Sequence, residues 1–280
     1  MPIHDQGYRR YAGTKLPHGR AWWVIARAGI MERLRERKFL GLLLFACLPF
    51  LVRAVQLYVA ANVPQASAFF EPSAQTFREF LDQQSIFVFF ITIYVGSGLV
   101  ANDRRANALQ IYLSKPLTRV DYITGKLVTL LIFLVGVTWV PAILLLVLQV
   151  LFAGNFTFFR QNLFLFPAIT VFAAIQVFLS AFAMLALSSL SKNRRFVAMM
   201  YAGIIFFTAA MYQALRGITG TRVWAFISPE DVLDVIAAVI FRSAGTPAIP
   251  MPTALLVVVV LIAASIWVLE RRIRGVEVVT

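Results

Sequence analysis

The charged residues best placed for specific chemistry lie in one short segment, residues 96–119, between two long uncharged stretches. One acid, four cations and a proline occur there, in the order Asp103, Arg104, Arg105, Lys115, Pro116 and Arg119. The chemistry they offer is ion pairing and hydrogen bonding rather than bond cleavage. A charged segment between two membrane spans lies at the membrane surface, where a soluble partner can bind it.

The same segment predicts a short surface helix that begins at Asn102 or Asp103 and ends before Pro116. Its apolar face is formed by residues at helical spacing, Ala106, Leu109 and Leu113. Thr118 and Asp121 then match a capping box, which predicts the start of a new helix. The alternative interpretation is an ordinary basic loop.

Side chains for catalysis are missing from the uncharged stretches. Both histidines, His4 and His18, precede the first stretch, and none of the 13 acids falls in the middle of one. The single cysteine, Cys47, excludes a disulfide within the chain and a cysteine metal site. No Gly-x-x-x-x-Gly-Lys-Ser/Thr phosphate loop occurs. We therefore expect no enzyme activity, no metal and no cofactor, and any ATP hydrolysis must occur in a partner.

The composition indicates an integral membrane protein with an all-α fold. The chain is 60% hydrophobic and 14% charged, whereas soluble domains average about 25% charged residues. A membrane helix needs about 20 apolar residues. Six runs predict spans, at residues 39–61, 83–101, 127–152, 163–190, 196–215 and 253–269.

Arg53 is the charged residue inside one of these runs. It either snorkels to the membrane surface or lines a substrate path.

Lysine and arginine are distributed unevenly over the predicted loops. With the N-terminus in the cytoplasm, twenty lie inside and five outside, and Arg53 is the remaining one. This positive-inside pattern places residues 1–38 and residues 271–280 in the cytoplasm. The charge of +13 is therefore a membrane-topology signal, and we expect no nucleic-acid partner. The polar start of the chain does not match a secretory signal.

Residues 21–38 predict an amphipathic helix ahead of the first span. Its apolar face repeats at helical spacing, at Trp23, Ala26, Ile30 and Leu34, and arginines occupy the other faces. Such a helix lies in the headgroup plane. The alternative is that it extends the first span into the cytoplasm.

Two further features concern the third predicted span and the outer segment after the fifth. Pro141 removes a backbone hydrogen bond and predicts a kink in the third span, either a hinge or a static bend. Residues 228–231, Ser-Pro-Glu-Asp, predict a helix start. An apolar stripe follows at Val232, Val235, Ile236, Val239 and Ile240. This outer helix is either a gate or a lid that packs on the bundle.

The order of these features resembles the ABC-2 type permeases of bacterial ABC transporters. A glycine-containing span end precedes the acid and the basic turn, and Leu-Ser-Lys-Pro-Leu-Thr-Arg and Gly125-Lys126 follow. Asp103–Ala108 stands where the family usually has Glu-x-x-x-Gly-Thr. The resemblance implies a coupling helix held by an ATPase subunit. Together with the helix face, it assigns this role to Asp103, Arg104, Arg105, Leu109, Leu113, Ser114, Pro116 and Arg119, with Lys126 also matching.

The resemblance also implies a function. The chain would be a permease subunit in the bacterial inner membrane, an exporter of unknown substrate driven by a separate ABC ATPase subunit. It would pair with a second permease subunit, identical or related. Closure of the ATPase would push the 103–114 helix and tilt spans two and three. The alternative is a membrane scaffold or assembly subunit without a transport path. Polar residues facing one cavity would favour transport.

Overall fold

The computed structural model describes residues 21–63, 73–108, 118–153, 160, 162–243 and 247–273. Within these ranges every regular element is a helix. Six helical segments are long and apolar enough to cross a membrane: Arg37–Asn62, Ala74–Arg105, Arg119–Phe152, Leu165–Leu190, Arg194–Thr219 and Met251–Arg272. The all-α membrane fold that the composition predicts is therefore confirmed.

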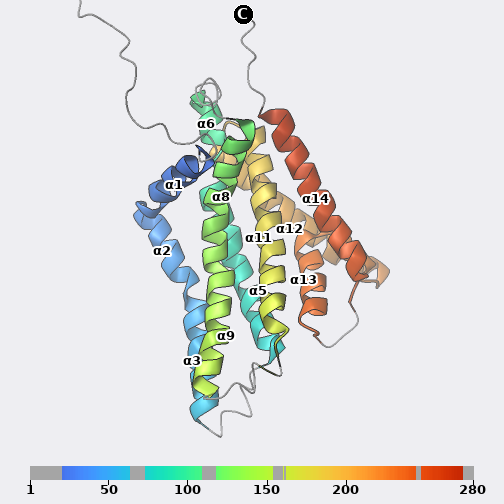
Figure 1. Cartoon of the computed structure of the whole chain (residues 1–280). Helices are drawn as coiled ribbons and strands as arrows, with labels where there is room; N and C mark the ends of the chain where they lie inside the picture. Colours follow the sequence, from blue (N-terminus) through green and yellow to red (C-terminus); the bar gives the residue numbers. More distant parts are fainter. Residues whose placement is uncertain are drawn as a thin grey trace, which may run out of the picture.

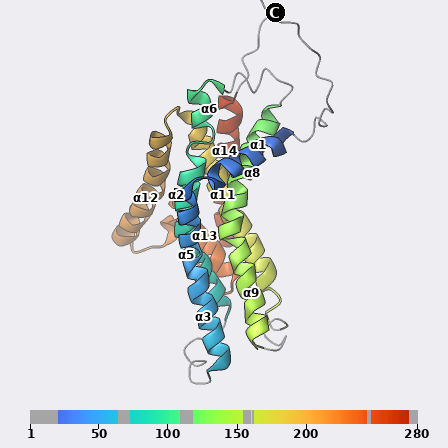
Figure 2. The ribbon, with the colours of Figure 1, turned by 90° about the vertical axis from the view of Figure 1, so that its left-hand side faces the viewer.

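Three helices form the N-terminal part. Helix α1 (Ala21–Leu34) lies across a later helix, α8 (Arg119–Val137), at an angle to α2 (Arg37–Ala46), as Figure 2 shows. Helices α2 and α3 (Leu48–Asn62) make up the first membrane-spanning segment, and Cys47 separates them just before Pro49. The second such segment consists of α5 (Ala74–Ile91), a π-helical turn η2 (Thr92–Gly96) and α6 (Ala101–Arg105).

Helix α5 begins well before Gln83, where the uncharged run starts. Its first turns carry Arg78, Glu79 and Asp82, which form ion pairs with other charged residues. A search for uncharged runs therefore starts this helix too late, because charged residues also form helices and here belong to its first turns.

The third segment is divided into α8 (Arg119–Val137) and α9 (Trp139–Ala153), separated at Thr138. The helix is therefore interrupted three residues before Pro141, and the kink itself stays a prediction. The remaining elements are α11 (Leu165–Leu190), α12 (Arg194–Thr219), the 3-10 turn η3 (Val223–Ile227), α13 (Pro229–Ile240) and α14 (Met251–Arg272). Ser228 accepts a hydrogen bond from the Asp231 backbone N–H at 3.4 Å, so the predicted start of α13 is confirmed.

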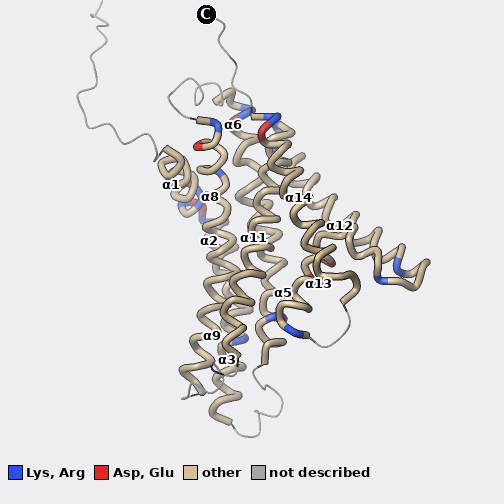
Figure 3. Tube along the Cα trace, turned by 45° about the vertical axis from the view of Figure 1, so that its right-hand side comes forward, with Lys and Arg blue, Asp and Glu red and all other residues tan. Residues whose placement is uncertain are grey.

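Helix α11 is the centre of the bundle and contacts α5, α8, α9, α12, α13 and α14. Figure 1 shows α1, α6 and the end of α14 at the same end of the bundle, which we call the α6 end. Helix α12 leans away from the others (Figure 2). Charged residues gather near α6, α1 and the last turns of α14 (Figure 3). Helix α1 and the last turns of α14 therefore lie at one end of the bundle (Figure 1).

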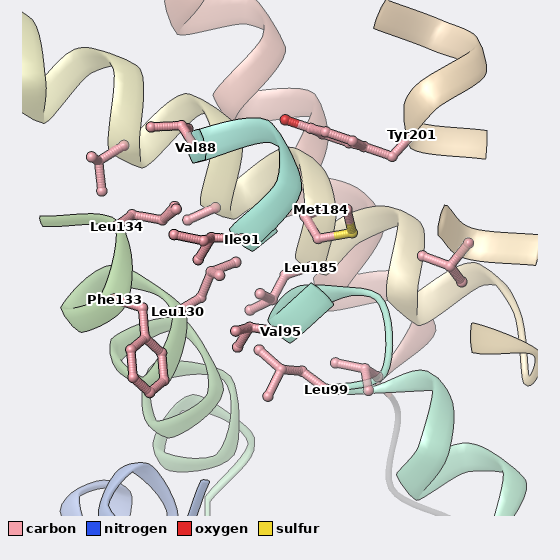
Figure 4. Packing of buried hydrophobic residues seen from close by; sticks show 14 of the residues in the cluster. Val88, Ile91, Val95, Leu99, Leu130, Phe133, Leu134, Met184, Leu185 and Tyr201 are labelled. Carbon is pink, nitrogen blue, oxygen red and sulfur yellow. The ribbon is translucent and has the colours of Figure 1, made fainter. Parts of the chain in front are cut away.

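Two clusters of buried apolar residues hold the helices together. In the cluster nearer the α6 end, Ile91 and Val95 lie between Leu130 of α8 and Leu185 of α11 (Figure 4). The second cluster joins α3, α9, α11, α13 and α14. Val232, Val235 and Ile236 of the predicted α13 stripe are buried in it, so α13 is packed into the bundle.

Helix α1 divides its predicted apolar face between the protein and the surface. Ala26 and Arg33 are buried, whereas Trp23 and Leu34 are exposed. The small residues on α1 face α8 because the backbones approach closely there. A Cβ atom at Gly125 of α8 would lie 2.8 Å from the Trp22 carbonyl oxygen. The apolar exposed residues remain available to the bilayer.

Candidate functional site

Asp103 fixes the start of the basic segment to α8. Its Oδ2 atom accepts hydrogen bonds from the Tyr122 hydroxyl at 2.8 Å and from Lys126 Nζ at 2.7 Å. The side chains of Asp103 and Lys126 are 17% and 14% exposed, and Tyr122 is buried. Tyr122 and Lys126 are four residues apart, so they share one face of α8. We call these three residues the Asp103 anchor.

The turn before α6 is fixed to α11 by two serines. The Ser188 hydroxyl accepts hydrogen bonds from the backbone N–H groups of Val100 and Ala101, both at 3.1 Å. It donates to the Ser97 carbonyl at 3.0 Å. The Arg104 guanidinium donates to the Ser189 carbonyl. Helix α6 is therefore held by the ends of two spans, α8 and α11.

Tyr94 of η2 links the same region to α1, α2 and α12. Its hydroxyl donates to Glu36 Oε2 at 2.7 Å, and Glu36 Oε1 accepts from Arg33 at 2.6 Å. The Tyr94 carbonyl accepts from Arg194 at 2.9 Å, and the Arg194 guanidinium lies 5.4 Å from the Tyr94 ring centroid. A π-helical turn inside an α-helix often marks a functional position. Here it carries the tyrosine that joins four elements.

Gly96 allows α8, η2 and α11 to pack this closely. A Cβ atom there would overlap Met184 Cγ and would lie 3.1 Å from Leu130 Cδ2. Any side chain would therefore displace η2 from the core that supports α6.

Four of the predicted coupling residues are described. Asp103 and Arg104 make the contacts above, whereas Arg105 and Arg119 are exposed. The others lie outside the described residues: Leu109, Leu113, Ser114 and Pro116. The predicted helix start is wrong, because Asp103 lies inside α6 and uses its carboxylate on α8 instead of capping.

The helix is also not continuous through residue 108. It ends at Arg105, and Asn107 has a φ of 52°. Asparagine tolerates this left-handed conformation better than most residues. The capping box before α8 is confirmed, since Thr118 Oγ1 accepts from the Asp121 N–H at 3.1 Å and Asp121 accepts from the Thr118 N–H at 3.3 Å.

Arg53 of α3 forms an ion pair with Glu79 of α5, with 3.0 Å between Nη2 and Oε2. It also donates to Gln56 at 3.3 Å. Neither sequence interpretation of Arg53 included this partner, because Glu79 lies in a different segment. Arg53 is not among the residues of the cavity described next.

A cavity of about 600 Å³ lies between α5, α11, α12, α13 and α14. Polar side chains from these elements line it, namely Asp82, Ser85, Gln176, Ser180, Tyr201, Gln213, Glu230, Asp231, Asp234 and Ser265. Burial and the Asp231 carboxylate raise the pKa of Glu230. Burial also raises the pKa of Asp231, although the Ser228 hydroxyl opposes the change. Both carboxyl groups lie outside the membrane-spanning segments. Their raised pKa values favour protonation or the binding of a cation.

Sequence reasoning missed several of these residues. Tyr122 carried a signal, because it lies four positions before Lys126 on a helix that a capping box predicts. Ser188 and Ser189 carried none, since serines are common in membrane helices. The cavity acids come from α5 and α13, which are distant in sequence, so spacing alone does not bring them together.

These elements define a multi-pass membrane protein with a polar cavity and a surface turn that is held by α8 and α11. Comparison with protein families gives the same class: the family model described as ABC-2 family transporter protein matches residues 23–272. The chain therefore belongs to the ABC-2 transporter family and is a permease subunit. That family is not enzymatic and implies a separate ATPase partner. No curated protein matches the chain.

Proposed function

We propose that this permease is driven by an ABC ATPase subunit that docks on the segment from α6 to the start of α8. The Asp103 anchor is the observation that carries the proposal. A partner that displaces this segment acts directly on α8 through Asp103 and on α11 through Arg104. Movement of the docked segment is thereby transmitted to the spans that pack around the core.

Transport is favoured over the scaffold alternative by the polar cavity. An assembly subunit needs an apolar packing surface, whereas this chain keeps ten polar residues on a cavity of about 600 Å³. Four of the helices around it, α5, α11, α12 and α14, also contribute to the apolar cluster nearer the α6 end, which includes Ala101 of α6 and Tyr122 of α8. The helices around the cavity are thus connected to the segment that we assign to docking. We propose export as the direction, with the substrate leaving from the outer side.

A second permease subunit, identical or related, would complete the assembly. The segments Arg37–Asn62, Arg194–Thr219 and Met251–Arg272 keep most of their apolar surface outside the bundle. Leu44 on α2 and Phe207 on α12 are 75% and 69% exposed. Lipid or another subunit must cover these faces.

The docking proposal is tested with a photo-crosslinking amino acid at Arg105, an exposed position of α6. We expect it to capture an ATPase subunit in native membranes. The same amino acid at Arg222, exposed next to η3, should capture none. Capture from Arg222 alone, or from both positions equally, would contradict docking at α6.

Orientation is tested separately by reporter fusions. We propose that both termini and α6 face the cytoplasm of a bacterium, in its inner membrane, because lysine and arginine favour that side twenty to five. A periplasmic reporter should be inactive at Thr280 and active when it is inserted between the end of α3 at Asn62 and the start of α5 at Ala74. Activity at Thr280 would reverse the topology.

A further inference from the structure

Gln176 gives the cavity a specific chemical requirement. It lies on the central helix α11, is 4% exposed and lines the cavity, and its Oε1 atom has no hydrogen-bond partner among the described residues. An unsatisfied buried acceptor is unfavourable. A ligand that donates a hydrogen bond to this oxygen would remove the penalty.

The charge around the same cavity is negative. Four carboxylates line it, from Asp82, Glu230, Asp231 and Asp234. Arg78 pairs with Asp234 and lies 3.9 Å from Asp82. In the described part of the chain no cation lies within 4 Å of Glu230 or Asp231. Arg216 of α12 acts on Asp231 only at longer range.

The remaining wall is apolar and aromatic. Leu179, Ile205 and Leu261 line the cavity together with the rings of Phe89 and Tyr201. Aromatic faces attract organic cations. The volume of about 600 Å³ lies in the range of roughly 300–1,000 Å³ that is typical of small-molecule sites.

We propose that this cavity binds a hydrophobic protonated amine. The ammonium group donates a hydrogen bond to Gln176 Oε1, Glu230 and Asp231 supply the compensating negative charge, and the apolar body packs on the wall. This inference rests on the proposed function, because it names the chemical class of the transported substrate. A neutral molecule would leave the carboxylates without a counter-ion, and an anion would be repelled.

The direct test is equilibrium binding of tritiated 4-phenylbutylamine to the full chain in nanodiscs of phosphatidylcholine and phosphatidylglycerol. Two competitors keep the same apolar body and change only the head group: 4-phenylbutanol is neutral and 4-phenylbutyrate is negative. We expect saturable amine binding, with both competitors at least about tenfold weaker because they lack the positive charge. Equal competition by the alcohol, or no saturable binding, would overturn the proposal with wild-type protein alone.

Variants then locate the site. Gln176→Leu removes the acceptor and should weaken amine binding about tenfold, the effect of losing one buried hydrogen bond to a charged group. The double change Glu230→Gln and Asp231→Asn should weaken it at least as much. Gln149→Leu is the matched control, since Gln149 is 5% exposed, has the same unpaired oxygen and is not among the cavity residues. Equal effects of Gln176→Leu and Gln149→Leu would reject the site.

A lipid head group could supply the same ammonium. Repeating the assay with phosphatidylethanolamine in the nanodiscs distinguishes the sources: weaker binding of the soluble amine assigns the site to the aminolipid, and unchanged binding assigns it to a soluble amine. Since the assay contains no ATPase, a lack of saturable amine binding rejects the amine as the ligand of this cavity and leaves the docking proposal intact. Normal amine binding without ATPase capture at Arg105 would instead reject docking.

Discussion

The side-chain amide of Gln84 donates a hydrogen bond to the Val137 carbonyl, with 2.7 Å between Nε2 and the oxygen. Val137 lies four residues before Pro141, whose missing N–H leaves this carbonyl without a helical partner. The same amide donates to the Ala46 carbonyl at 3.2 Å, beside the break between α2 and α3. One fully buried glutamine therefore satisfies the backbone at interruptions in two spans.

Gln84→Leu should lower the free energy of unfolding in detergent by about 1–2 kcal/mol, because it leaves the Val137 carbonyl unpaired. Pro141→Ala restores the helical N–H. In that background the loss caused by Gln84→Leu should shrink, since Val137 has regained a donor. An equal loss in both backgrounds, measured by thermal or denaturant unfolding, would show that Gln84 does not compensate for the proline.

The Asp103 anchor predicts coupled effects of two substitutions. Asp103→Asn leaves the Lys126 ammonium nearly enclosed without its counter-ion, and Lys126→Met does the same to the carboxylate. Each change should cost about 1–3 kcal/mol, less than breaking a fully buried pair. The double variant should recover part of this loss, because neither charge is then unpaired. Strictly additive losses in unfolding experiments would exclude an energetic link between the two residues.

The contact of α1 with α8 depends on the absence of a side chain at Gly125. A Cβ atom there would lie 2.8 Å from the Ile25 Cβ atom and the Trp22 carbonyl oxygen. Gly125→Ala should therefore destabilise the protein by about 1–3 kcal/mol through overpacking. It should also expose Trp22, which tryptophan fluorescence detects.

The matched control is Gly136→Ala in the same helix, where a Cβ atom meets nothing within 4 Å. It should be neutral or stabilising by up to about 1 kcal/mol, because alanine favours helices. Similar effects of both substitutions would mean that α1 does not pack on α8 as described.

Asp231 predicts a pH-dependent stability. Its pKa is raised by burial, so the folded state binds the proton more tightly than the unfolded chain. The stability of the wild type relative to Asp231→Asn is therefore highest below the unfolded pKa and falls as pH rises through the folded pKa. Near pH 7 the asparagine variant should melt higher than the wild type, and near pH 3 the two should agree. A constant difference across this range would contradict the raised pKa.

The fold was accessible from sequence because each span is a continuous apolar run, and six of them determine an all-helical bundle. The caps at Thr118 and Ser228 were accessible for a related reason: they depend on residues three positions apart. The interruption of the third span at Thr138 was accessible because Pro141 lacks an N–H.

What the sequence did not reveal depends on tertiary contacts. Asp103 looked like a helix cap, but Lys126 and Tyr122 compete for its carboxylate. Arg53 looked isolated, because its partner Glu79 comes from another span. Periodicity did not show which residues of the α1 stripe face the protein, because that depends on close backbone packing at Gly125. The cavity acids come together only when α13 packs on α11, α12 and α14, which brings Asp234 to Arg78 of α5.

The central claim is that a separate ATPase drives this permease through the segment from α6 to the start of α8. Its most direct test is the ATPase activity that copurifies with the tagged chain from native membranes. We propose that Leu109 contacts the partner, so Leu109→Asp would bury an unpaired charge and weaken docking a hundredfold or more, about 3 kcal/mol.

The control is the same substitution at Leu163, an exposed residue just before α11 at the end of the bundle opposite α6. The account predicts that ATPase activity copurifies with the wild type and with Leu163→Asp, falls to background with Leu109→Asp, and is absent from the chain stripped of partners. Full activity with Leu109→Asp, or hydrolysis by the stripped chain itself, would contradict it.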